Sequence, residues 1–186
     1  MNNNNHIIIY IMANFKDSPK FQVHNDYYTP EYAWTNISHL IPKDKVVWEA
    51  CMLNSHKSKS PEYLSKICQE VIYDCNMDIL KTQPNNYDMI ITNPPFETNI
   101  KKDILKKLVE LDKPFIIIMN SLNIYSKYIR DIFKDNFKDL QVINPYGKIH
   151  FEKLLDNGDL EYRPNTSFYC IYLCYKMNLK NEELWL

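Results

Sequence analysis

The feature of this sequence that most limits its fold is the alternation of short, wholly apolar runs with amphipathic helical segments. The runs Tyr87–Thr92 and Pro114–Met119 flank the segment Ile100–Leu111, whose leucines and isoleucines fall on one helical face. Strands that are apolar throughout, rather than at every second residue, are typical of a parallel sheet covered by helices on both faces. The sequence therefore predicts an α/β fold with a doubly wound, mostly parallel sheet.

The other predicted elements follow the same alternation until the end of the chain. No helix signal separates the last two strand-like runs, 148–151 and 167–176, and the polar connection between them contains Gly158. An antiparallel hairpin on the edge of the sheet is therefore the expected ending. We expect one domain over residues 21–186, preceded by an N-terminal extension over residues 1–20. The remaining predicted helices are 29–40, 61–69 and 125–137, and the remaining predicted strands are 45–51, 70–74 and 140–143.

Charge and cysteine content exclude several classes of protein. Lys and Arg number 22 against 23 Asp and Glu, a formal net charge of -1, so any contact with nucleic acid must be local. The five cysteines show no metal-type spacing, which argues against a disulfide framework and predicts no metal site. The apolar run Ile7–Ala13 is shorter than the roughly 20 residues that span a bilayer. We therefore expect a protein of the cytoplasm or nucleus with no membrane partner.

Three predicted strands end in a polar residue. Glu49 follows the first strand, Asp74 follows the second, and Asn93 follows the strand that contains Ile90 and Ile91. In an open α/β sheet, ligands bind beyond the carboxyl ends of the strands, near the point where the strand order reverses. Taken singly, each of the three is more typical of a solvated loop residue or a helix cap.

The turn Asn93-Pro94-Pro95-Phe96 carries a more specific signal. Two consecutive prolines fix two φ angles and remove two backbone donors, so the nearby carbonyls project as acceptors. The Asn93 amide oxygen and a neighbouring carbonyl can together accept both hydrogens of one exocyclic amine, while Phe96 stacks on the base. Two such acceptors make an aromatic amine more nucleophilic in the transition state. The position of the turn, between an apolar strand and an amphipathic helix, favours this interpretation over a purely structural turn.

With this tetrapeptide the chain resembles the class I S-adenosylmethionine-dependent methyltransferases that act on the N6 amine of adenine. Their catalytic motif is Asp, Asn or Ser followed by Pro-Pro and an aromatic residue. The stretch from Val46 to Met177 looks especially similar to small adenine-methylase-like proteins of large DNA viruses. The resemblance implies a Rossmann-like fold, S-adenosylmethionine as cofactor and a nucleic-acid substrate. It also implies that the catalytic residues are Asn93, Pro94, Pro95 and Phe96.

The same resemblance implies a set of cofactor-binding residues. The segment around Tyr28, Thr29 and Pro30 resembles the one that helps hold the methionine part of the cofactor. Asp74 matches the acid that usually bonds the ribose hydroxyls in this family. The rest of the set is Glu49, Cys51, Asn54 and Asp78. The chain is too short for a separate target-recognition domain, so any sequence specificity is expected to come from its few loops, a homodimer or a companion subunit.

The loop after the first strand departs from the family, whose members place glycines there. Residues 49–58 contain no glycine, and the whole chain has only Gly147 and Gly158. Two hypotheses of different class therefore stay open. One is an active methyltransferase acting on DNA, RNA or a cap-proximal adenine, and the other is a catalytically degenerate subunit that binds nucleic acid or a partner. Methylation of an amide-type nitrogen is a third interpretation, because the same turn holds any planar amine.

A run of lysines follows the catalytic turn. Such a run could touch phosphate, but a charged helix face of this kind is usually solvated, and the sequence favours that interpretation. The run consists of Lys101, Lys102, Lys106 and Lys107, with Lys113 beyond the helix.

Overall fold

The computed structural model describes residues 27–52, 55–155, 157, 159–162 and 168–180. Its centre is a six-stranded sheet in the order β3-β2-β4-β5-β9-β6. The first four strands of this order run parallel, and β9 lies antiparallel to both of its neighbours. The strands are β2 (Val46–Trp48), β3 (Glu70–Ile72), β4 (Met89–Thr92), β5 (Phe115–Asn120), β6 (Leu140–Ile143) and β9 (Cys170–Tyr175).

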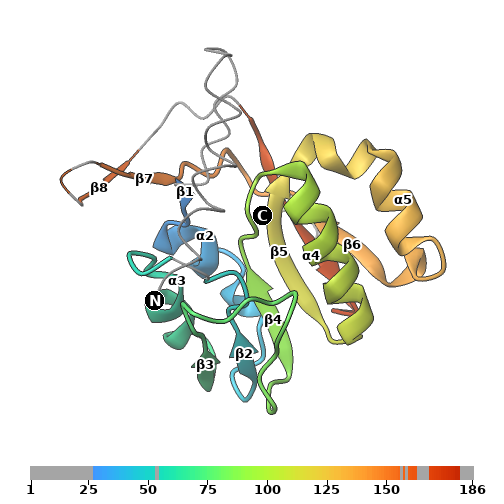
Figure 1. Cartoon of the computed structure of the whole chain (residues 1–186), viewed down its shortest axis with the longest axis horizontal. Coiled ribbons are helices and arrows are strands. Elements are labelled where there is room, and N and C mark those ends of the chain that lie inside the picture. The colour runs from blue at the N-terminus through green and yellow to red at the C-terminus, as the bar shows by residue number, and fades with distance from the viewer. Residues whose placement is uncertain (1–26, 53–54, 156, 158, 163–167, 181–186) are drawn as a thin grey trace, which may run out of the picture.

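Helices cover both faces of this sheet (Figure 1). The buried side chains of α4 and α5 pack with Ile90 and Ile117 on one face, whereas those of α2 and α3 pack with Ile91 and Ile116 on the other. Neighbouring residues of one strand thus enter different cores, which explains why the strands are apolar throughout. The predicted doubly wound, mostly parallel fold is confirmed. The helices are α2 (Glu31–Thr35), α3 (Ser60–Ser65), α4 (Thr98–Leu111) and α5 (Lys127–Phe133).

Short 3-10 turns replace the ends of two predicted helices. The predicted helix 29–40 is divided into α2 and the 3-10 turn Ser38–Leu40, because Thr35, Asn36 and Ile37 form helices poorly. The predicted helix 125–137 is α5, which is shorter at both ends; the 3-10 turns Ser121–Tyr125 and Phe137–Asp139 flank it. These boundaries do not change the topology.

The expected ending of the sheet is partly wrong. Residues 148–151 form no strand, and β9 lies between β5 and β6 instead of pairing with that run at the edge. All six residues of β9 are buried, which is typical of an inner strand, whereas the less buried β6 is the outermost strand on this side of the sheet. An antiparallel hairpin does form, but between β7 (Glu152–Leu154) and β8 (Leu160–Tyr162), inside the predicted connection.

This hairpin belongs to a second, three-stranded sheet. In it β7 also pairs antiparallel with β1 (Tyr27–Tyr28), in the order β1-β7-β8. The small sheet lies near the upper end of the large sheet in Figure 1, where the parallel strands end. The predicted boundary between residues 20 and 21 lies outside the described residues. No helix in the described part of the chain is long and apolar enough to cross a membrane.

Candidate functional site

The strand order places the candidate site at the carboxyl edge of the large sheet, by which we mean the end at which its parallel strands finish. Strand β2 pairs with β3 on one side and with β4 on the other, so the order reverses between β2 and β4. Ligand sites of open α/β sheets lie at such a reversal, beyond the carboxyl ends of the strands. Glu49, Asp74 and Asn93 follow β2, β3 and β4 respectively, and all three therefore lie along this edge.

The Asn93 side chain is held by one contact and keeps one atom open. Its Nδ2 donates a hydrogen bond to Thr29 Oγ1 at 3.1 Å, and Thr29 is buried. Its Oδ1 is buried and has no hydrogen-bond partner among the described residues. A buried carbonyl oxygen without a donor is costly in a folded protein, so each one in a native structure needs a physical explanation. Thr29 therefore orients the amide and leaves its oxygen without a donor from the described residues.

A buried carboxyl group lies next to this turn. Glu49 is only 3% exposed, and it accepts a hydrogen bond from the hydroxyl of Thr92, the residue before Asn93. The backbone N–H of Cys51 donates to Thr92 Oγ1 at 3.0 Å and to Glu49 Oε1 at 3.4 Å. Burial raises the pKa of Glu49 to about 7, and the hydrogen bonds from Thr92 and Cys51 partly oppose this rise. The network joins the carboxyl ends of β2 and β4 and can hold or release a proton near neutral pH.

The thiol of Cys51 is not a nucleophile in this setting. Burial raises its pKa to about 12, so the thiol stays protonated. All five cysteines of the chain are free. Within the described part of the chain, no three His, Cys, Asp or Glu residues are placed to hold a metal ion.

Two aspartates beyond β3 border the same edge. The Oδ1 of exposed Asp74 accepts hydrogen bonds from the backbone N–H of Asn76 at 2.8 Å and from its side chain at 3.2 Å. Asp78 accepts from the backbone N–H of Leu80 at 3.0 Å and pairs with Lys81 at 3.0 Å. The Asp78 charge also contributes to the raised pKa of the Cys51 thiol, so it lies close to the loop after β2.

That loop needs no glycine where the structure describes it. The backbone N–H of Ser55 donates to the Met52 carbonyl at 2.8 Å, and that of Ser58 donates to the Ser55 carbonyl at 2.9 Å. Among the described residues, positive φ angles outside glycine occur only at Asp112, Lys176 and Asn178, far from this loop. Tight turns with negative φ angles suit any residue type. Asn54, predicted to bind cofactor, lies outside the described residues.

The predicted segment 28–30 joins the small sheet to the site. Tyr28 ends β1 and pairs with Glu152 of β7, whereas Pro30 is buried and precedes α2. Between them, Thr29 is the residue that contacts Asn93. The structure thus brings one member of the predicted cofactor set into direct contact with the predicted catalytic turn.

Phe96 lies in an aromatic cluster made of distant parts of the chain. Its ring centroid lies 5.9 Å from that of Tyr27, 5.6 Å from Phe151 and 5.2 Å from Phe168. Edge and tilted contacts of this kind are favourable for aromatic rings. Phe151 and Phe168 come from segments that sequence analysis did not connect with the site, because only the fold brings residues so far apart together.

Lys101 is a site residue that the sequence interpretation missed. It is only 2% exposed, its Nζ donates to the Phe96 carbonyl at 3.1 Å, and burial lowers its pKa. The sequence did contain a signal, because Lys101 shares one helical face with the apolar residues Ile104, Leu105 and Leu108. Lys106 and Lys107, by contrast, pair with Asp103 and Glu110 at the surface, as a solvated face requires.

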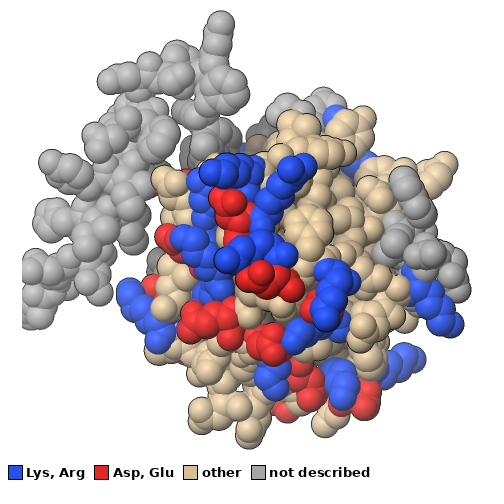
Figure 2. Space-filling model, turned by 90° about the vertical axis from the view of Figure 1, so that its right-hand side faces the viewer, with Lys and Arg blue, Asp and Glu red and all other residues tan. Residues whose placement is uncertain are grey.

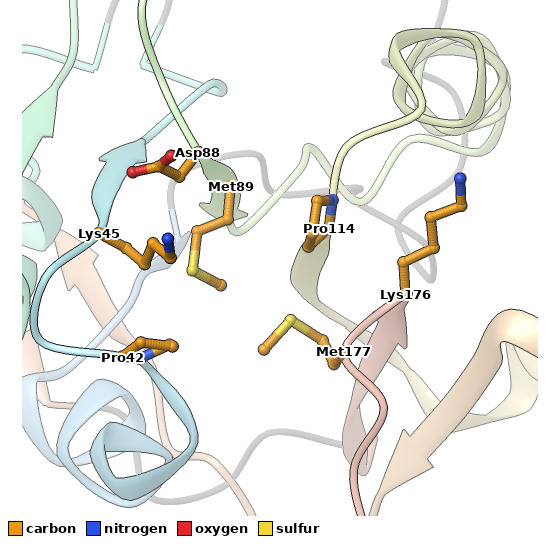
Figure 3. A pocket seen from close by; sticks show the side chains of 7 residues that line it. All are labelled: Pro42, Lys45, Asp88, Met89, Pro114, Lys176 and Met177. Carbon is orange, nitrogen blue, oxygen red and sulfur yellow. The ribbon is translucent and has the colours of Figure 1, made fainter.

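A cavity of about 280 Å³ lies at the opposite end of the sheet, where the parallel strands begin. Lys45 precedes β2, Met89 begins β4 and Met177 follows β9, so these residues mark the amino ends of the parallel strands. Figure 3 shows the side chains around this cavity, with both methionines pointing toward its centre. The cavity is therefore separate from the Asn93 turn. Its lining is Pro42, Lys45, Asp88, Met89, Pro114, Lys176 and Met177.

Comparison with known proteins identifies the fold. No family model matches the chain, and no curated protein matches it in sequence. A candidate RNA methyltransferase from Pyrococcus horikoshii superposes with a TM-score of 0.51 and 18% identity, over 95% of this chain and 99% of that one. A candidate class I S-adenosylmethionine-dependent methyltransferase from Listeria monocytogenes superposes with a TM-score of 0.52 and 9% identity, over 97% and 71%.

The chain therefore has the fold of class I S-adenosylmethionine-dependent methyltransferases. Identities this low concern the fold and leave the substrate open. The closer resemblance, to enzymes that methylate the N6 amine of adenine, stays a prediction from the sequence.

Proposed function

We propose that this protein is an S-adenosylmethionine-dependent methyltransferase that acts on the N6 amine of adenine in a nucleic acid. The observation that carries the proposal is the Asn93 amide: Thr29 fixes its nitrogen, and its buried oxygen has no donor among the described residues. An exocyclic amine supplies the missing donor. The carbonyl of Pro94 is proposed as the second acceptor, because proline at position 95 leaves that peptide without a donor.

The chemistry requires little more than this turn. The lone pair of an aromatic amine is delocalised into the ring, and two acceptors on its hydrogens return electron density to nitrogen as the new bond forms. When bound, S-adenosylmethionine would supply the methyl group from its sulfonium, while Asn93 and the Pro94 carbonyl would hold the accepting amine, whose surplus proton would pass to solvent. Phe96 is proposed to stack on the adenine once the base leaves its strand.

The residues at the carboxyl edge fit this cofactor. It carries a positive ammonium group and ribose hydroxyls, and carboxylates are the acceptors that suit both. Glu49 is proposed to face the methionine end, and Asp74 the ribose. The other residues proposed to hold the cofactor are Tyr28, Thr29, Pro30, Cys51, Asn54 and Asp78.

A second candidate function rests on the glycine-free loop 49–58. A degenerate subunit would keep the fold and the purine-binding turn but would not bind cofactor productively. It would act by binding nucleic acid or a companion methyltransferase chain, or as half of a homodimer. Such a subunit would bind adenine-containing strands without methyl transfer under any condition.

Calorimetric titration with S-adenosylmethionine and S-adenosylhomocysteine comes first. Binding in the micromolar range, about -8 kcal/mol, supports the active enzyme, whereas no binding by the protein alone supports the degenerate subunit. Labelled methyl transfer onto DNA, RNA and capped RNA then defines the substrate.

The Asn93→Ala variant tests the catalytic turn. It should abolish methyl transfer while cofactor affinity and the unfolding midpoint stay near those of the wild type. Asn85→Ala is the matched control, because Asn85 is exposed in the connection before β4. Equal turnover by Asn93→Ala and Asn85→Ala would remove the central claim.

A further inference from the structure

Several large exposed side chains lie at the carboxyl edge of the sheet, where β5 and β6 end and β9 begins. Leu122, Tyr125, Tyr146 and Tyr169 keep between 61% and 96% of their surface in contact with solvent. Single exposed apolar residues are ordinary, but a group of rings at one place usually marks an interaction site.

The topology places these residues together. Leu122 and Tyr125 lie in the 3-10 turn that follows β5, and the N–H of Ser121 in that turn donates to the Tyr169 carbonyl at 2.8 Å. Tyr169 precedes β9, which runs antiparallel to β5, so it leaves the sheet where β5 ends. The two segments therefore lie side by side.

Tyr146 reaches the same place from β6. Ile143 at the end of β6 is the partner of Tyr172, and Tyr146 and Tyr169 each lie three residues beyond this pair. Lys148, two residues after Tyr146, places its Nζ 4.7 Å from the centroid of the Tyr169 ring. An ammonium at this distance is held by the face of the ring.

Cations lie in or next to these segments. Residues 120–130 and 144–151 contain Lys127, Arg130 and Lys148, and the first acids beyond them are Asp131 and Glu152. Elsewhere on the side formed by α4 and α5, Lys and Arg intermingle with Asp and Glu, as Figure 2 shows. Of these cations, Lys148 is in contact with one of the exposed rings.

We infer that Leu122, Tyr125, Tyr146, Tyr169 and Lys148 form a tyrosine platform that binds unpaired nucleic-acid bases beside the Asn93 turn. Exposed flat rings with nearby cations are the elements by which proteins bind single strands, and duplex bases, already stacked, cannot use them. The platform shares the sheet edge with Asn93, since β5 is the direct neighbour of β4. The inference rests on the proposed function and narrows its substrate to a single strand, RNA or DNA.

Fluorescence anisotropy of labelled 12-nucleotide strands tests the platform, with the full chain carrying Asn93→Ala so that no turnover occurs. Single-stranded RNA or DNA should bind at least tenfold more tightly than the matching duplex. Tyr125→Ser and Tyr146→Ser should each weaken binding about tenfold. Lys148→Ala should weaken it less and should lower the slope of affinity against salt. Comparing the two polymers shows which one the platform prefers.

Phe137→Ser is the matched control, because Phe137 is a half-exposed aromatic residue at the opposite end of the sheet, just before β6 begins. It should leave binding unchanged. Equal affinity for duplex and single strand would overturn the inference. So would unchanged binding by the two tyrosine variants, or self-association that these variants abolish, which would mark the platform as a protein interface.

The two proposals fail separately. If binding depends on the platform but the wild type transfers no methyl group, the platform is supported and the proposed enzymatic function is contradicted. If the tyrosine variants transfer methyl groups at the wild-type rate, the enzymatic function is supported and the platform is contradicted.

Discussion

The buried carboxyl of Glu49 makes the stability of this fold depend on pH. Its pKa is raised from 4.5 to about 7, chiefly by burial. Between these pH values the folded state holds the proton and the unfolded chain releases it. The free energy of unfolding should therefore fall as the pH rises from about 4.5 to about 7, and this contribution should be constant above that range. The difference in pKa corresponds to about 3 kcal/mol, at 1.36 kcal/mol per pH unit.

Glu49→Gln removes this dependence and keeps the shape of the side chain. The amide oxygen still accepts from the Thr92 hydroxyl and the Cys51 N–H, as the carboxyl does. At pH 8 the variant should be more stable than the wild type by about 3 kcal/mol, and near pH 4.5 the two should be similar. With a slope of about 2 kcal/mol per molar urea, the midpoint at pH 8 should rise by about 1.5 M.

The assay is urea denaturation of both proteins at several pH values from 4.5 to 8. Other groups titrate in this range, so the informative quantity is the difference between variant and wild type at each pH. Glu62→Gln, an exposed glutamate in α3, is the control and should leave the pH profile parallel to that of the wild type. A Glu49→Gln difference that stays constant across the range would refute the reasoning.

Three further substitutions test other parts of the molecule. Thr29→Val removes the acceptor that orients Asn93, so turnover at saturating cofactor should fall about tenfold, and an unchanged rate would contradict the positioning role. Lys101→Met removes a buried amine together with its hydrogen bond to the Phe96 carbonyl. The free energy of unfolding in urea should change by less than about 1 kcal/mol, while methyl transfer slows. A large loss of stability with normal turnover would show that the lysine is purely structural. Phe115→Ala empties a fully buried site between aromatic rings and should cost about 3 to 5 kcal/mol in urea unfolding, against which a loss below about 1 kcal/mol would speak.

Local pattern predicted the elements that local sequence governs. Strand β6 has the bounds expected for it, and β4, α4 and β5 differ from expectation by one or two residues. The apolar runs of these strands and the apolar face of α4 are properties of neighbouring residues, so they can be read without the fold. The Asn93 turn was found in the same way, because its two prolines are adjacent.

Pairing between distant segments was not predictable in this way. The run that became β9 signals a buried strand, but its place between β5 and β6 depends on which strands form hydrogen bonds with its backbone on each side. The contact between Thr29 and Asn93 joins residues 64 positions apart, and the contact between Glu49 and Thr92 spans 43. No periodicity encodes such distances.

The sequence by itself determined the α/β class, the parallel core strands and the candidate catalytic turn, because each depends on hydrophobic period or on the rigidity of proline. Only the tertiary structure decided which atoms of the turn are held and which stay open, and that Lys101 is buried. It alone gathered the exposed rings of the tyrosine platform at one edge. These properties depend on burial and on contacts between distant segments, and both exist only after the chain has packed.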